Sequence, residues 1–227
     1  MKILFAFAIS TCAWAQINRP NIGKMLDANG AVRTVYGIAA SVSLGDPEIT
    51  GVLSQGCGKD FCLAKTATSI VSSSGSVDAP AGAALFAFAS DAAFVWFPES
   101  RQLAEWQNGV LTSIDSTIDG EVLSMRSSAG SVEFAVRRSS GVWLVKPDGS
   151  AVDSLPSSGP LMLIPGGVVY ATRDEMVIRD LRIPLDRVTS FSRMAADYLQ
   201  VRAGGVDYAL CIEKGRETLF QLPGVQQ

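Results

Sequence analysis

The chain reads Ser131-Val-Glu-Phe-Ala-Val-Arg-Arg-Ser-Ser-Gly-Val-Trp-Leu-Val-Lys-Pro-Asp-Gly-Ser150 in the clearest copy of a unit that recurs along it. The unit joins two short apolar runs through a turn and ends in a polar stretch that contains glycine. A second copy is Ala84-Leu-Phe-Ala-Phe-Ala-Ser-Asp-Ala-Ala-Phe-Val-Trp-Phe-Pro-Glu-Ser100. One such unit cannot bury its own apolar face, so repetition on this scale favours a stacked architecture. The repeat indicates a fold and leaves the chemistry open.

Runs rich in Val, Ile, Phe, Tyr and Trp alternate with clusters of Gly, Pro, Asp and Ser, which is typical of an all-β protein with many short strands. The expected strands cover residues 32–36, 51–54, 61–65, 68–72, 83–89, 94–97, 121–125, 132–137, 142–145, 161–164, 168–172, 176–180, 198–202, 207–212 and 218–222. Residues 98–109 carry helix signals at both ends, but their place in the repeat favours a turn followed by a strand. Residues 192–199 fit either a helix or a strand.

Four-stranded units of roughly 40 residues are what the blades of a β-propeller require. We therefore predict an all-β, propeller-like array of about five short antiparallel sheets, formed by residues 16–227 as one domain. Residues 30–37 would then be a strand without a hairpin partner nearby. We expect this strand to pair with residues 218–222 and to close the ring, because closure removes exposed sheet edges.

The segment Val142-Trp-Leu-Val-Lys-Pro-Asp-Gly-Ser150 resembles the Trp-x-x-x-Pro-Asp-Gly turn of TolB-type and WD-like bacterial β-propeller repeats. The segment Phe94-Val-Trp-Phe-Pro-Glu-Ser100 keeps the Trp and the Pro but has Glu-Ser in place of Asp-Gly. The whole chain is also similar to uncharacterised secreted bacterial proteins that open with a Val-Arg-x-Val-Tyr-Gly segment. The resemblance implies export and a propeller-like fold. It implies no activity, since propellers host unrelated functions.

Residues 1–15 have the form of a signal peptide, with Lys2 before a short apolar run and the small residues Ala13 and Ala15 at the cleavage site. We therefore expect an extracytoplasmic protein, either periplasmic or secreted. Cys12 suggests a lipoprotein as the alternative, although Thr11 is larger than the residue that normally precedes a lipidated cysteine. No later run reaches the roughly 18 apolar residues of a membrane helix, so we expect no membrane span.

Charge and cysteine content narrow the range of partners and sites. The chain has 22 acidic and 19 basic residues, without a basic patch, which argues against nucleic acid as a partner. Cys57 and Cys62 flank a tight polar loop, and we predict a disulfide between them. The alternative is a metal site, but a tetrahedral site needs about four ligands and the chain has no histidine. Cys211 lies in an apolar run and is expected to be a buried free thiol.

The absence of histidine also excludes Ser-His-Asp and Cys-His nucleophile activation and histidine general bases. Carboxylates are the remaining route to catalysis. Asp115, Asp119 and Glu121 suggest either a cation loop or a glycosidase pair, but they lack the alternate spacing of a calcium loop. They also fit a solvated connection between two blades.

Three tryptophans could line a sugar or peptide site, because aromatic faces bind both. Trp96 and Trp143 take equivalent positions in two repeats, which indicates core packing between blades. Trp106 has no such counterpart, so we expect it to offer an exposed contact.

Together these features predict an exported binding or scaffolding module without a cofactor or a metal. Its ligand, an unidentified protein or glycan, would meet loops on one face of the ring, and we assign Trp106, Asp115, Asp119 and Glu121 to binding. The alternatives are an extracytoplasmic enzyme that acts on glycans through paired carboxylates and a structural component of the cell envelope. An enzyme is less expected than a binding module.

Overall fold

The computed structural model describes residues 20–38, 41–128, 130–156 and 159–224, so the predicted signal peptide and Cys12 lie outside the described residues. Every regular element in these ranges is a β-strand, which confirms the all-β prediction. Residues 98–109 form a turn and a strand as predicted, and residues 192–199 belong to two strands and the turn between them. The described part of the chain contains no helix of the length and apolar character that crossing a bilayer requires.

The strands form six antiparallel sheets, each made of strands consecutive in the chain, and we call them blades 1 to 6. Blade 1 has three strands, which are β1 (Asn21–Leu26), β2 (Val32–Ile38) and β3 (Ser41–Ile49). Blades 2 and 3 have four strands each: β4 (Ser54–Cys57), β5 (Cys62–Lys65), β6 (Ser69–Ser72) and β7 (Gly75–Asp78), then β8 (Leu85–Phe88), β9 (Ala92–Phe97), β10 (Gln102–Gln107) and β11 (Val110–Ile114).

Blades 4, 5 and 6 also have four strands each. Blade 4 contains β12 (Glu121–Ser128), β13 (Ser131–Arg138), β14 (Gly141–Val145) and β15 (Ala151–Leu155). Blade 5 contains β16 (Leu161–Ile164), β17 (Gly167–Ala171), β18 (Glu175–Ile178) and β19 (Leu181–Pro184). Blade 6 contains β20 (Val188–Ala195), β21 (Tyr198–Ala203), β22 (Val206–Cys211) and β23 (Thr218–Gln221).

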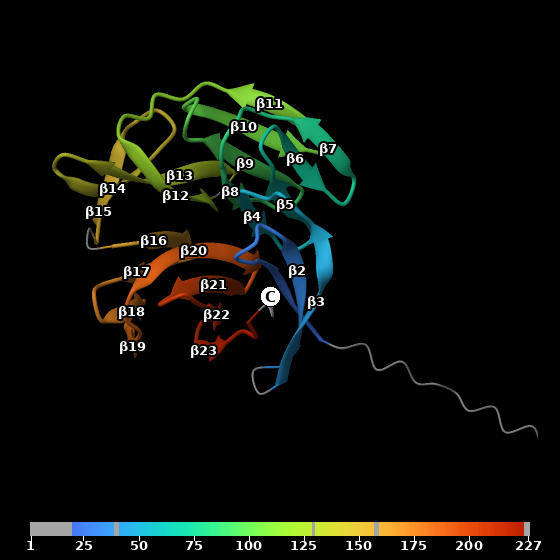
Figure 1. Cartoon of the computed structure of the whole chain (residues 1–227). Helices are drawn as coiled ribbons and strands as arrows, with labels where there is room; N and C mark the ends of the chain where they lie inside the picture. The colour runs from blue at the N-terminus through green and yellow to red at the C-terminus, as the bar shows by residue number, and fades with distance from the viewer. Residues whose placement is uncertain (1–19, 39–40, 129, 157–158, 225–227) are drawn as a thin grey trace, which may run out of the picture.

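The blades follow one another around a ring in which the red blade 6 lies beside the blue blade 1 (Figure 1). The inner strands β4, β8, β12, β16 and β20 contact one another in order, and β20 also contacts β4. This arrangement confirms the propeller-like fold. The described residues form six sheets rather than about five, because residues 20–49 build a blade of their own.

The core is divided among the junctions between blades. Buried apolar clusters lie at each junction, and the one between blades 3 and 4 joins Trp96 to Phe134 with ring centroids 5.9 Å apart. Trp143 is partly buried against the same cluster, so both tryptophans serve the blade packing that the repeat predicts. The cluster between blades 1 and 2 is small, with only Val32, Val52 and Ala64 buried in it. This junction is therefore the least filled in the ring.

The prediction that residues 30–37 pair with residues 218–222 and close the ring is wrong. Residues 30–37 lie largely in β2, which pairs with β1 on one side and β3 on the other. Strand β23 (Thr218–Gln221) pairs with β22, and no described strand pairs with its other edge. The partners of β2 escaped prediction because they are poor in strand-forming residues: β1 contains Asn21 and Gly23, and β3 contains the sequence Gly45-Asp46-Pro47.

Blade 1 has an odd number of strands, and this reverses its first strand. A chain that passes through four antiparallel strands starts each new blade in the same direction, whereas three strands invert it. Accordingly, the start of β1 lies against the end of β20, where a Cβ at Gly23 would be 2.4 Å from the carbonyl oxygen of Met194. The end of the hairpin lies near the start of β4, since Val52 donates to the carbonyl of Gly30. Strand β1 is thus antiparallel to both of its inner neighbours.

Side-chain amides occupy the edge of β1 that faces the ring. The buried Gln200 of β21 accepts from the Leu26 amide at 3.0 Å and donates to the Leu26 carbonyl at 2.8 Å. Gln55 of β4 donates to the Lys24 carbonyl at 2.9 Å and to the Arg193 carbonyl at 3.4 Å. Buried backbone groups need such partners, and here two glutamines supply them in place of a neighbouring strand.

We predict that Gln200→Ala lowers the free energy of unfolding by about 2 kcal/mol, because it leaves the Leu26 amide buried without an acceptor. Urea unfolding at pH 7 measures the loss. Gln102→Ala on the exposed start of β10 is the matched control and should change stability by less than about 0.5 kcal/mol. Equal stability of the two variants would show that the amide does not fasten blade 1 to the ring.

Candidate functional site

A cavity of about 620 Å³ lies at the least filled junction, between blade 1 and blade 2. Its walls come from the first half of β1, the end of β3, the β4–β5 hairpin and the β6–β7 turn, with Met194 and Ala195 at the end of β20. These segments share one face of the ring, because the β4–β5 hairpin and the end of β20 both follow inner strands. We refer to this space as the junction cavity.

The lining of the junction cavity combines an apolar interior with charges of both signs. Ile22, Phe61, Leu63 and Val71 are among its apolar residues. The charged residues are Lys24, Glu48, Lys59 and Asp60, two of each sign. Asn21, Ser72 and Ser73 add uncharged hydrogen-bonding groups. The cavity therefore suits a ligand that has an apolar part and polar groups around it.

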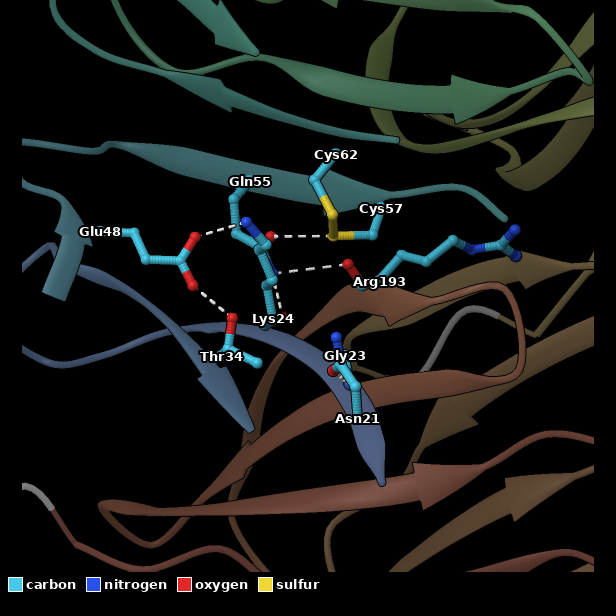
Figure 2. The surroundings of a disulfide bond; sticks show 9 residues. All are labelled: Asn21, Gly23, Lys24, Thr34, Glu48, Gln55, Cys57, Cys62 and Arg193. Carbon is cyan, nitrogen blue, oxygen red and sulfur yellow. Dashed lines mark hydrogen bonds and ion pairs between the residues drawn. A yellow bond between two sulfur atoms is a disulfide. The ribbon is translucent and has the colours of Figure 1, made fainter. Parts of the chain in front are cut away.

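The β4–β5 hairpin is held in place by a disulfide and by aromatic packing. Cys57 and Cys62 are bonded, with their Cα atoms 4.0 Å apart, which confirms the predicted disulfide and excludes both as metal ligands (Figure 2). A Cβ at Gly58 would lie 2.9 Å from the Phe88 ring, so glycine is required for blade 3 to pack on the hairpin. Phe61 contacts Phe88 and Trp106, with ring centroids 5.3 and 5.0 Å apart. The wall of the cavity is accordingly rigid.

An ion pair joins two of the strands that line the junction cavity. Lys24 Nζ of β1 lies 2.5 Å from Glu48 Oε2 of β3, and Thr34 of β2 donates to the other carboxylate oxygen (Figure 2). Burial alone would raise the pKa of Glu48, but the hydrogen bonds from Lys24 and Thr34 outweigh it and lower the pKa below the ordinary value. Glu48 is therefore ionised at neutral pH, and its pair with Lys24 sets one end of the cavity.

Trp106 does not have the exposure that we expected. Its side chain is 5% exposed and packs in the core between blades 2 and 3. The expectation of an exposed contact is wrong because Phe61 of the neighbouring blade covers the indole. Its ring lies behind Phe61, which itself lines the junction cavity.

Asp115, Asp119 and Glu121 all lie exposed at the connection from blade 3 to blade 4. Glu121 pairs with Arg137 at 2.8 Å, and both side chains are largely exposed. Because this connection precedes an inner strand, it lies on the opposite face from the junction cavity. No group of three or more Cys, Asp or Glu side chains that could hold a metal ion occurs within residues 20–38, 41–128, 130–156 and 159–224.

The cysteines are the predicted residues that the structure brings to the cavity, and Cys211 is a buried free thiol as expected. Sequence reasoning missed Lys24, Glu48 and Gln55. Gln55 is the one long polar residue in β4, which is otherwise made of small residues, and this is the one signal that the sequence offers. Lys24 and Glu48 lie in β1 and β3, which are among the strands that the sequence analysis did not predict.

No family model matches the chain, and no curated protein matches it. Among solved structures, a protein of unknown function from Bacteroides caccae is similar with a TM-score of 0.55 and 15% identity, over 89% of this chain and 93% of that one. PorZ, a surface component of the type-IX secretion system of Porphyromonas gingivalis, matches 92% of this chain with a TM-score of 0.48 and 12% identity. The match covers only 39% of PorZ. AztD from Citrobacter koseri matches with a TM-score of 0.47 and 10% identity, over 90% of this chain and 71% of AztD. The similarity to the Bacteroides caccae protein supports the propeller-like fold and assigns no activity.

We predict that replacing both cysteines, Cys57→Ala with Cys62→Ala, lowers the free energy of unfolding by about 2 kcal/mol, as loop-closure entropy gives for so short a loop. Urea unfolding with and without dithiothreitol measures this loss. Dithiothreitol should lower the free energy of unfolding of the wild type by the same amount. It should leave the stability of the double variant unchanged. A stability that does not respond to reduction would contradict the prediction.

We also predict a pH dependence that depends on Glu48. A carboxyl whose folded pKa is lowered stabilises the fold above its unfolded pKa of about 4.3, and this contribution disappears as the pH falls through the folded pKa. Glu48→Gln should therefore be less stable than wild type at pH 7, by up to about 1 kcal/mol for a partly exposed pair. The difference should shrink below about pH 4 in denaturant titrations. A difference that is constant from pH 7 to pH 3 would contradict this.

Proposed function

We propose that this protein is an exported binding module that takes up a segment of a protein partner in the junction cavity. The observation that carries the proposal is the cavity of about 620 Å³ between blades 1 and 2. The disulfide beside it fits an oxidising, extracytoplasmic compartment, since such bonds are rare in the cytosol. The ligand face is therefore the one that carries the β4–β5 hairpin.

The chemistry of the lining favours a protein segment as the ligand. An apolar side chain of the partner would enter between Phe61, Val71 and Ile22, where it loses contact with water. Lys24, Glu48, Lys59 and Asp60 would pair with polar groups at its margins, and charges of both signs suit a peptide that carries both. A packed apolar anchor inside a polar rim is the usual anatomy of a protein interface.

The carboxylate hypothesis receives no such support. Asp115, Asp119 and Glu121 are exposed, and none of them lines the junction cavity. A glycan-acting enzyme would need two carboxyl groups facing each other across a cleft. We therefore keep these residues as an alternative ligand face, which the experiment below distinguishes from the cavity.

The test is capture of partners from the native envelope fraction by purified protein, with Ser73→Trp as the variant that fills the cavity mouth. Ser73 is an exposed turn residue that lines the cavity, so a large side chain there should block entry without disturbing the core. We expect Ser73→Trp to reduce capture of a specific partner at least tenfold. The reduction should follow from slower association or faster release, measured by surface plasmon resonance with the identified partner.

Ser139→Trp is the matched control, because Ser139 is an exposed turn residue of blade 4 outside the cavity lining. It should bind as the wild type does. Loss of capture in the combined variant Asp115→Asn, Asp119→Asn and Glu121→Gln, with Ser73→Trp unaffected, would overturn the cavity proposal in favour of the opposite face. Binding of the wild type to a glycan array with no protein partner would overturn the assignment of a protein ligand.

A further inference from the structure

A second cavity, of about 270 Å³, occupies the centre of the ring. It is lined by residues of the inner strands β4, β8, β12, β16 and β20, together with Leu26 of β1 and Gln200 and Arg202 of β21. All six blades thus contribute to it, and we call it the central channel. Gln55 lines both this channel and the junction cavity, so the glutamine separates the two spaces.

The central channel carries positive charge in a protein whose net charge is −3. Its charged lining residues are Arg193 and Arg202, and no acidic side chain of the described residues lines it. Arg202 is neutralised locally, because it donates to Asp207 at 2.9 and 3.2 Å and to the Leu26 carbonyl at 3.1 Å. Arg193 is therefore the charged lining residue whose side chain has no ion pair within the described residues.

The guanidinium of Arg193 has neither a hydrogen bond nor an ion pair within the described residues, although the residue is partly buried. No fully buried side-chain nitrogen in the described chain lacks a partner, so the nitrogens of Arg193 must reach accessible space. Figure 2 shows the side chain extending away from the disulfide and from Lys24. Burial lowers the pKa of Arg193, and the charge of Asp197, which lies beyond ion-pair distance, raises it only in part. An arginine held this way has five N–H donors available.

Serine hydroxyls in the same channel are also poised to donate. Ser54 Oγ accepts from the Ala84 amide at 2.9 Å, and Ser124 Oγ accepts from the Leu163 amide at 3.0 Å. Each hydroxyl keeps its own hydrogen, and neither has an acceptor within the described residues. Hydroxyl donors without acceptors that line the same channel as an arginine without an ion pair are the groups that an oxyanion requires.

We propose that the central channel binds a small anion that has a carboxylate or phosphate group held by Arg193 and an apolar body. The apolar part follows from the rest of the lining, which includes Phe86, Met125, Met162 and Phe191. The volume of about 270 Å³ admits a compact molecule and excludes a folded partner. This site is separate from the junction cavity, so its failure would leave the proposed function untouched.

The test compares the thermal unfolding midpoint in benzoate, in inorganic phosphate and in neutral benzyl alcohol, at matched ionic strength. At a concentration 100 times its Kd, a bound anion should raise the Tm of the wild type by about 5–10 °C. Benzyl alcohol should not, because it has no charge for Arg193. A shift with benzoate alone would identify an organic carboxylate, and a shift with phosphate alone would identify a phosphoryl group.

Arg193→Met should abolish the anion-dependent shift, and Arg193→Lys should retain part of it because a single ammonium replaces the guanidinium fork. Without anion, Arg193→Met should melt at the wild-type temperature or a few degrees higher, since an unpaired, partly buried charge has been removed. Arg173→Met, at a fully solvated arginine of blade 5, should keep the whole shift. The proposal is overturned if the shift survives Arg193→Met, if the neutral alcohol gives the same shift, or if neither anion stabilises the wild type. If Arg193→Met does not fold, Arg193→Lys serves as the test variant, and an anion-dependent Tm shift as large as that of the wild type overturns the proposal.

Discussion

The ring depends on the hydrogen bonds between the Gln200 amide and the backbone of Leu26. Blade 1 has three strands, and β1 contacts both β4 and β20 although it runs against the direction of both. The carboxamide of Gln200 presents the same donor and acceptor as a peptide group, and it satisfies the edge of β1 that no strand covers. Gln55 likewise donates to the carbonyl of Lys24, two residues earlier in β1. These two side chains hold blade 1 against the ring together with the apolar cluster that joins Met25 and Val35 to Met194.

The incomplete blade also produces the site. Where four strands meet four strands, apolar faces fill the wedge between blades, as Trp96 and Phe134 do between blades 3 and 4. Blade 1 brings Val32 and little else to its junction with blade 2, and the remaining space is the junction cavity. The β4–β5 hairpin with its disulfide forms one wall of this cavity, because it belongs to blade 2 and lies on the same face of the ring. The cavity lies where the three-stranded blade meets blade 2, and no sequence motif marks it.

Sequence patterns predicted the middle strands of the blades better than the strands at their edges. Strand β9 is buried at every position, and β13 alternates around Phe134 and Val136, so both give strong apolar signals. The outermost strands β7, β11 and β19 are mostly exposed, and they were missed because their pairing depends on a neighbour and not on their own apolar pattern. The disulfide was predictable because its loop is local. The burial of Trp106 and the junction cavity beside blade 1 were not predictable, because both depend on residues that are far apart in the sequence.

The bond between Leu26 and Gln200 spans 174 residues of sequence, which gives the assembly an order in time. Blades 2 to 6 are successive hairpins, and local contacts of this kind form quickly as the chain becomes available. Blade 1 is synthesised before β21, yet the edge of β1 stays open until β21 has been made. Until then β1 has an unsatisfied strand edge, and unsatisfied edges are where chains pair with the wrong partner. The glutamine that completes the ring is also the group that closes this edge.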